Sequence, residues 1–108
     1  MEKHIKGAYL LDIYGELLTE KQNLAMNLFY NEDLSMSEIA LELNVSRQAA
    51  FDLIKRTQKI IEDYDSKLNL LDKYLRCTEK LEEIARLSGE SVHSEQINGL
   101  VNEIIDIL

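Results

Sequence analysis

The sequence predicts an all-α protein of about six helices, and three observations support this prediction. The 108 residues include four glycines and no proline, which favours long helices over a turn-rich β architecture. Serine and threonine residues stand at helix-capping spacing at three points in the chain. Apolar residues recur at helical spacing in most segments. A single helical domain covering residues 1–108 is the natural interpretation of this length.

Two helices are expected in the N-terminal part of the chain. Leucines recur at helical spacing over residues 5–17, despite two glycines. A capping box at residues 19–22 begins a second helix, which ends near Tyr30. The polar run at residues 31–33 then interrupts the pattern.

The next segment predicts a helix-turn-helix motif. A second capping box at residues 35–38 begins a short helix that ends near Leu43, and Ser46 can cap the following helix. Only two residues then connect the helices, and Ala40 and Val45 are small enough to pack where the helices cross. We expect a helix-turn-helix core at about residues 18–61.

A C-terminal helical extension is expected at about residues 62–108. It contains a wide apolar stripe from residue 68 to about 87, a break at residues 88–91, and a last helix capped by Ser94. Either an intramolecular hairpin or a dimer interface would explain these stripes. Because the stripes need more cover than one last helix gives, we predict a homodimer. The expected interface residues are Leu53, Ile60, Leu68, Leu71 and Leu75.

The charges are unevenly distributed along the chain. Twenty acidic and 12 basic residues give a net charge of −8, so the average field of the chain repels polyanions. Residues 44–61 hold four basic residues against one acidic residue, a net charge of +3. Residues 1–43 and 62–108 have net charges of −5 and −6. Any contact with nucleic acid is therefore expected on the second helix of the motif.

The candidate nucleic-acid-binding residues lie on the outer face of that helix. Ala50 and Ile54 are expected to face inward, so side chains near the helix start can reach base edges while later basic residues contact phosphates. Asp52 would either repel phosphate or pair with Lys55 or Arg56. Phe51 could stack on an unpaired base or contact a thymine methyl group, but we favour the interpretation that it packs against a neighbour. A solvated helix face that is merely basic is the alternative. The candidates are Arg47, Gln48, Phe51, Lys55, Arg56 and Lys59.

The sequence does not favour an enzyme or a metal protein. It contains no glycine-rich phosphate loop, no zinc-ligand spacing and no arrangement typical of a catalytic triad, so we expect no catalytic residue, metal or cofactor. Cys77 stands alone and is expected to be a small buried side chain, and His4 lies near a terminus expected to fray. Without a membrane-spanning or signal segment, the expected location is cytoplasmic, with no membrane insertion.

Several stretches resemble known families. LTEKQ at 18–22, LFY at 28–30, LSMSEIA at 34–40 and LNVS at 43–46 resemble region four of bacterial sigma factors. Nearly the whole chain resembles the YlxM family of small helix-turn-helix proteins, most recognisably in YNEDLS at 30–35 and VSRQA at 45–49. Phe51, Asp52 and Leu53 depart from the sigma pattern of basic or hydroxyl side chains, which argues against sequence-specific promoter reading.

The resemblance implies a bacterial cytoplasmic protein with a sigma-region-four-like bundle that regulates or assists the signal recognition particle pathway. Our first hypothesis is a regulatory protein that binds DNA or a structured RNA. The alternative is an acidic adaptor for a signal recognition particle component, its GTPase or its RNA complex, in which the helix-turn-helix is only a scaffold. In that case charge reversal at Glu79, Glu82 and Glu83 would disrupt binding more than reversal on the recognition helix.

Overall fold

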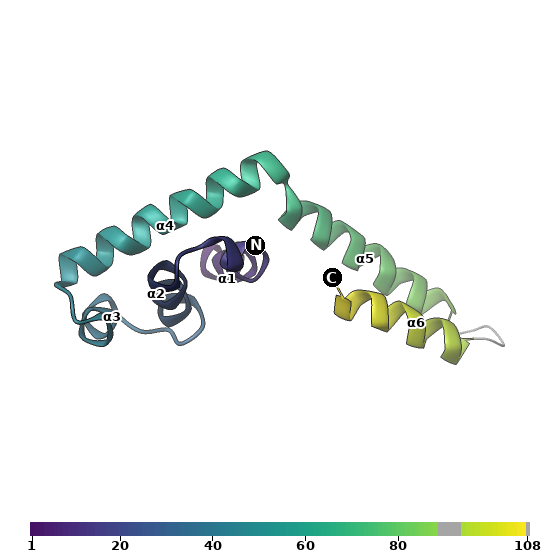
Figure 1. The fold of residues 1–108 in the computed structure, drawn as a ribbon. Helices are drawn as coiled ribbons and strands as arrows, with labels where there is room; N and C mark the ends of the chain where they lie inside the picture. Colours follow the sequence, from purple (N-terminus) through teal and green to yellow (C-terminus); the bar gives the residue numbers. More distant parts are fainter. Residues whose placement is uncertain (89–93, 108) are drawn as a thin grey trace. The chain divides into compact units, whose positions relative to one another are not determined.

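The computed structural model describes residues 1–88 and 94–107, and this part of the chain is helical without any β-strand (Figure 1). The all-α prediction is therefore confirmed. A short 3-10 turn, Gly15–Leu17, follows the first helix. The α-helices are α1 (Lys3–Tyr14), α2 (Glu20–Tyr30), α3 (Met36–Leu43), α4 (Arg47–Leu68), α5 (Leu70–Ser88) and α6 (Ser94–Ile107).

The chain divides into two compact units, Met1–Asn69 and Leu70–Leu108. The division comes after the predicted start of the extension at residue 62, because α4 continues without a break to Leu68. Asn69 ends the helix in the left-handed conformation, with φ of 53°, and its backbone N–H donates to the carbonyl oxygen of Asp65. Asparagine adopts this conformation more readily than most residues, so it is a suitable helix terminator.

Local capping chemistry sets the starts of α2, α3 and α4. The hydroxyls of Thr19, Ser35 and Ser46 each accept a hydrogen bond from the backbone N–H three residues later, at 3.2, 3.2 and 3.0 Å. At α2 and α3 the reciprocal bond of the capping box is also present. These three predicted caps are confirmed. Ser94 is the first residue of α6, and the predicted break before it lies largely outside the described residues.

The helix-turn-helix is held together by a small apolar core. Leu28 of α2, Ile39 and Ala40 of α3 and Ala50 of α4 are buried against one another. The partly buried side chains packed around this cluster are Phe29, Leu34, Met36, Leu43 and Val45. The predicted packing roles of Ala40 and Val45 are thus confirmed.

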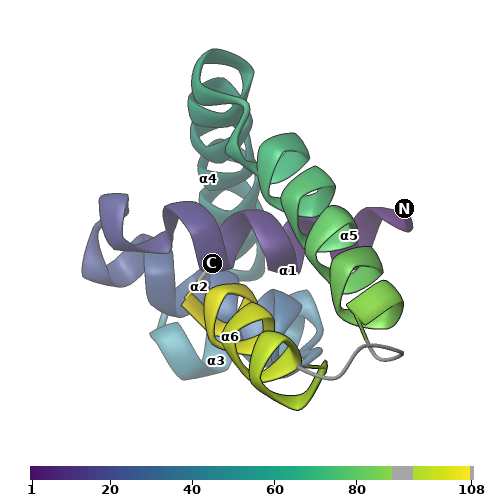
Figure 2. The same cartoon turned by 90° about the vertical axis from the view of Figure 1, so that its right-hand side faces the viewer.

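In the first unit, α1, α2 and α3 lie on one side of the long helix α4 (Figure 1), and α1 runs across it (Figure 2). Buried side chains seal this contact: Tyr14 and Ile54 are almost completely inaccessible. The Tyr14 hydroxyl donates to Oδ1 of Asp65 at 2.7 Å, which ties α1 to the last turns of α4. The packing of these helices therefore holds α4 in place within the first unit.

In the second unit, α5 and α6 lie side by side and run in opposite directions (Figure 1). Leu71 and Val101 are buried. Large apolar side chains of this unit remain between 40 and 61% exposed, namely Leu70, Ile84, Leu87, Leu100 and Ile104.

Two expectations about single residues are wrong. Cys77, expected to be buried, is exposed on α5. His4, expected near a frayed end, is held by contacts with the α2–α3 region: its Nε2 lies 3.2 Å from the carbonyl oxygen of Tyr30 and 3.0 Å from Oδ1 of Asp33. Its ring also packs against the rings of Phe29 and Tyr30. His93 lies outside the described residues.

Replacing Gly7 with alanine is expected to destabilise the first unit, because a Cβ at this position would overlap the ring of Tyr30. The ring is not free to yield, since its hydroxyl accepts a 2.9 Å hydrogen bond from Nε2 of Gln58. The expected cost is roughly 1–3 kcal/mol from overpacking, which outweighs the better helix propensity of alanine. Thermal unfolding of the Gly7→Ala variant, compared with wild type, measures this loss of stability.

Gly99→Ala is the matched control, because a Cβ there meets no atom within 4 Å. Replacing this helical glycine with alanine is expected to stabilise α6 by roughly 0.5–1 kcal/mol. The two substitutions are chemically identical and should have opposite signs. A lower unfolding temperature for both variants, or for neither, would contradict the role assigned to the Gly7–Tyr30 contact.

The capping box at the start of α3 is expected to make stability depend on pH. A hydrogen bond from the backbone N–H of Ser35, and a second one with the Ser35 side chain, hold the pKa of Glu38 below its ordinary value of 4.5. Because the folded pKa is the lower one, the stabilisation is present above the unfolded pKa and is lost as the pH falls through the folded pKa. Glu38→Gln keeps the hydrogen-bonding side chain, as Gln22 does in α2, but does not titrate.

We therefore expect wild type to exceed Glu38→Gln in unfolding temperature at neutral pH and to lose this advantage in acid. The measurement is thermal unfolding of both proteins at a series of pH values from neutral to acidic. A difference that stays constant with pH would show that the charge of Glu38 does not contribute.

Candidate nucleic-acid interface

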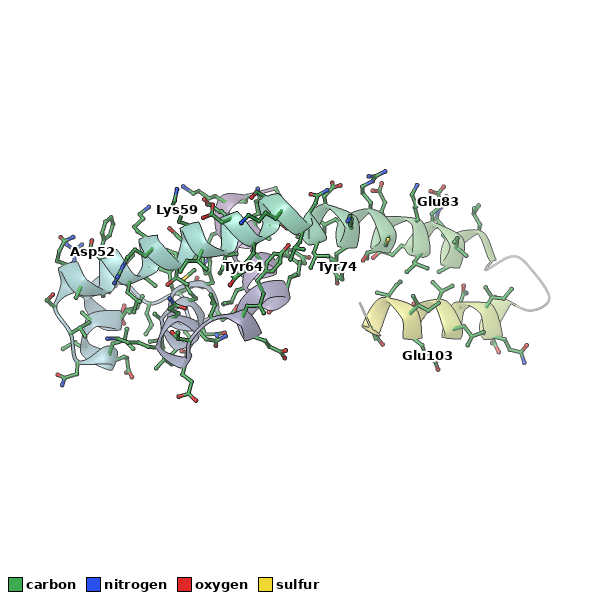
Figure 3. The ribbon with its side chains drawn as sticks, turned by 45° about the horizontal axis from the view of Figure 1, so that its top comes forward. Asp52, Lys59, Tyr64, Tyr74, Glu83 and Glu103 are labelled. Carbon is green, nitrogen blue, oxygen red and sulfur yellow. The ribbon has the colours of Figure 1, made fainter. Side chains whose placement is uncertain are left out.

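The first four turns of α4 have sharply different inner and outer faces. Ala50 and Ile54 are completely buried against the rest of the first unit. Arg47, Gln48 and Lys55 are exposed on the other side. Figure 3 shows the labelled Asp52 and Lys59 pointing outward from this helix. The structure thus agrees with the predicted inward and outward positions.

The exposed basic side chains of this segment form what we call the basic face: Arg47, Lys55, Arg56 and Lys59. They extend over about 18 Å of helix at the usual rise per residue. The basic face ends where Glu62 and Asp63 follow, both of them exposed. A polyanion would therefore be attracted to the N-terminal part of α4 and repelled beyond Lys59.

Asp52 lies within this surface and has different partners from those expected. Its carboxylate Oδ1 accepts a 2.9 Å hydrogen bond from Nε2 of Gln48, one turn earlier. Arg56 donates through Nε to the backbone carbonyl oxygen of Asp52 at 3.4 Å rather than to its carboxylate. The Gln48 amide nitrogen is thus engaged within the helix, and the carboxylate charge is offset only by its basic neighbours.

Phe51 is the aromatic member of the surface. Its side chain is 41% exposed, in agreement with its predicted outward position, so the favoured interpretation that it packs against a neighbour is wrong. Nζ of Lys55 lies 5.6 Å from the centre of its ring, within the range of a cation–π contact. Together with Met36, Arg47 and Gln48, the ring lines an open hollow of about 460 Å³ at the start of α3 and α4.

The predicted dimer-interface residues do not share one level of exposure. Leu53 is 9% and Leu71 5% exposed, so both are already buried within a single chain. Ile60 and Leu75 are partly buried, and Leu68 is 46% exposed. Burial of Leu53 follows from its position between Ala50 and Thr57 on the inner face of α4, a packing that the sequence pattern underestimated.

The anchoring of α1 through the contacts of His4 was not expected from the sequence. The signal was weak, because a histidine near a chain end has no periodic pattern to mark it. Glu2, whose carboxylate accepts from the backbone N–H groups of His4 and Ile5, is the one local sign that the helix is ordered from its start. His4 is far from α4 in the sequence and is not part of the basic face.

Within residues 1–88 and 94–107, no group of three or more histidine, cysteine or acidic side chains is placed to hold a metal ion. The same part of the chain has no helix with the length and apolar character needed to cross a membrane.

A family comparison agrees with this geometry. The sequence model of the family UPF0122, described as "Putative helix-turn-helix protein, YlxM / p13 like", matches residues 1–101. The chain belongs to the UPF0122 family. The resemblance to YlxM is thereby confirmed, and the family is one of helix-turn-helix proteins rather than a family of enzymes.

Relatives in UPF0122 match both units of the chain. The UPF0122 protein YlxM of Bacillus subtilis is 41% identical over 96% of this chain and 94% of its own length. A UPF0122 protein of Halalkalibacterium halodurans is 40% identical over 96% of this chain and 95% of its own, and one of Clostridium novyi is 42% identical over 99% and 93%. These matches extend over nearly the whole chain, so they include residues of both units.

Proposed function

We propose that this chain is a non-enzymatic regulatory protein that binds DNA or a structured RNA through the basic face of α4. The observation that carries the proposal is the placement of charge. The one positively charged segment of an acidic chain forms the exposed face of the second helix of a helix-turn-helix. In this motif that helix is the one that enters a nucleic-acid groove.

The acidic remainder of the chain supports specific orientation. A phosphate backbone is attracted to the basic face and repelled by the other surfaces, so approach with the wrong side is disfavoured. Four basic side chains neutralising phosphates would give a salt dependence of roughly −3 to −4 in the logarithm of the binding constant against the logarithm of salt concentration. Binding is thus expected to be strongly sensitive to salt.

We further propose that the regulatory role is that of an accessory factor in the signal recognition particle pathway. The support is the YlxM resemblance, since that family is associated with this pathway. The signal recognition particle RNA is accordingly the structured RNA to test first.

The test is fluorescence anisotropy of labelled signal recognition particle RNA titrated with the full chain at several salt concentrations, with unlabelled duplex DNA as competitor. Saturable binding with the expected salt slope supports the proposal. Resistance to duplex competition assigns the target to RNA, and loss of the complex to duplex assigns it to DNA. If neither nucleic acid binds near physiological salt, the proposal is wrong and the acidic adaptor replaces it.

We also propose that the chain forms a homodimer. The supporting observation is the set of large apolar side chains that stay exposed on the α5–α6 unit, because exposed apolar surface is available for burial against a second copy. Of the residues predicted for the dimer interface, Ile60 and Leu68 on α4 and Leu75 on α5 keep some exposure. Sedimentation should give the mass of two chains. The mass of one chain throughout the micromolar range would contradict a dimer.

A further inference from the structure

The hollow beside Phe51 has walls suited to a planar, partly polar ligand. Phe51 contributes an exposed aromatic face, and Met36 contributes a flexible and polarisable side chain. Arg47 contributes a planar guanidinium that can stack or bind phosphate. The side-chain amide nitrogen of Gln48 donates to Asp52, so the side-chain carbonyl oxygen of Gln48 is the atom that can accept a hydrogen bond from a ligand. One aromatic surface with polar groups at its edge is the arrangement that holds nucleobases.

A fully paired duplex would use these walls poorly. Bases within a duplex present only their edges to a groove, because both faces of each base are stacked on neighbours. The Phe51 ring could then contact little besides a thymine methyl group. Asp52, next to it on the outer face, would place a carboxylate toward the phosphates of a backbone lying across α4. An unpaired base has a free face and can enter the hollow alone.

We propose that the hollow at Phe51 binds one unpaired nucleobase, from a single-stranded loop, bulge or end, by stacking on the Phe51 ring. The inference rests on the proposed nucleic-acid binding and adds the class of target to it. Nζ of Lys55 lies over the Phe51 ring, 5.6 Å from its centre, and Lys55 does not line the hollow, so the base would stack on the part of the ring that faces the hollow. Lys55 and Arg47 would then lie beside it to hold the flanking phosphates. Specificity then depends on the absence of pairing more than on groove contacts.

The experiment uses two Phe51 variants and one control variant of the full chain, with two labelled probes. The probes are an RNA hairpin with an unpaired loop and a blunt, fully paired duplex with the same number of phosphates. Phe51→Leu keeps an apolar side chain but removes the aromatic face. It should weaken hairpin binding by about 5- to 150-fold, the usual range for loss of one base–aromatic stack. Its affinity for the duplex should stay within about twofold of wild type.

Phe51→Trp supplies an independent readout, because the chain contains no other tryptophan. Binding of the hairpin should be retained, and the tryptophan fluorescence should be quenched by the stacked base. The duplex should leave this fluorescence nearly unchanged. Leu24→Ala, at a half-exposed leucine on α2, is the control for loss of apolar surface elsewhere.

The outcomes separate this inference from the proposed function. Equal weakening of both probes by Phe51→Leu, or no weakening of either, overturns the stacked base while leaving nucleic-acid binding intact. Unquenched tryptophan in a saturated hairpin complex also overturns it. If wild type binds neither probe, the proposed function fails and the inference fails with it. Circular dichroism spectra identical to that of wild type establish that both variants are folded.

Discussion

The double variant Arg47→Glu, Lys55→Glu is expected to bind nucleic acid roughly 100-fold more weakly than wild type at physiological salt. Each reversal removes a phosphate or base contact and adds a repelling charge to the basic face. The slope of binding against salt should become less steep by about two units, one for each lost phosphate contact. The measurement is the anisotropy titration described above, repeated at each salt concentration.

Both changes are expected to leave the fold intact. Arg47 and Lys55 are exposed, and Arg47 is the first residue of α4, where the helix dipole favours an acidic side chain over a basic one. Loss of binding by this variant can therefore be assigned to the surface. Thermal unfolding within a few degrees of wild type would verify this assignment.

Lys21→Glu with Lys67→Glu is the matched control. Both lysines are exposed in the first unit but outside the basic face, and the double change alters the net charge by the same amount. The control should weaken binding only slightly, through the long-range field. If it weakens binding as much as the Arg47, Lys55 variant, the overall charge and not the basic face governs binding. If neither variant weakens it, the basic face is not the binding surface.

Ile54→Ala is expected to produce a large loss of stability in the first unit. Ile54 is completely buried where α4 packs on its neighbours, and truncation leaves a cavity that the surrounding helices cannot close. The expected loss is about 2–5 kcal/mol. Since small domains unfold with only about 5–15 kcal/mol, a substantial fraction of this variant could unfold at moderate temperature. Urea denaturation followed by circular dichroism measures the change.

Leu41→Ala controls for the removal of an apolar side chain from a helix of the same motif. Leu41 is 82% exposed, so its truncation should change the free energy of unfolding by no more than about 0.5 kcal/mol. A similar loss for both variants would mean that helix propensity rather than burial determines the effect. A loss under about 1 kcal/mol for Ile54→Ala would contradict its place in the core.

Features encoded within a few residues could be predicted from the sequence. The starts of α2, α3 and α4 depend on Thr19, Ser35 and Ser46, each of which bonds a backbone group only three residues away. The inward position of Ala50 and Ile54 follows from the helical period alone. These interactions need no partner from elsewhere in the chain, so the sequence pattern states them directly.

The properties of single side chains on those helices depended on the tertiary structure. The helical period places Phe51 on the outer face of α4, but it does not tell whether a neighbour covers the ring, and the structure shows the ring 41% exposed beside Met36 and Arg47. His4 is held because Tyr30 and Asp33, distant in sequence, come within hydrogen-bonding distance of it. The fold class, the motif and the location of the positive charge follow from local patterns and could be predicted from the sequence. How far each side chain is open to a ligand depends on packing, because exposure is set by neighbours that the chain brings together across many residues.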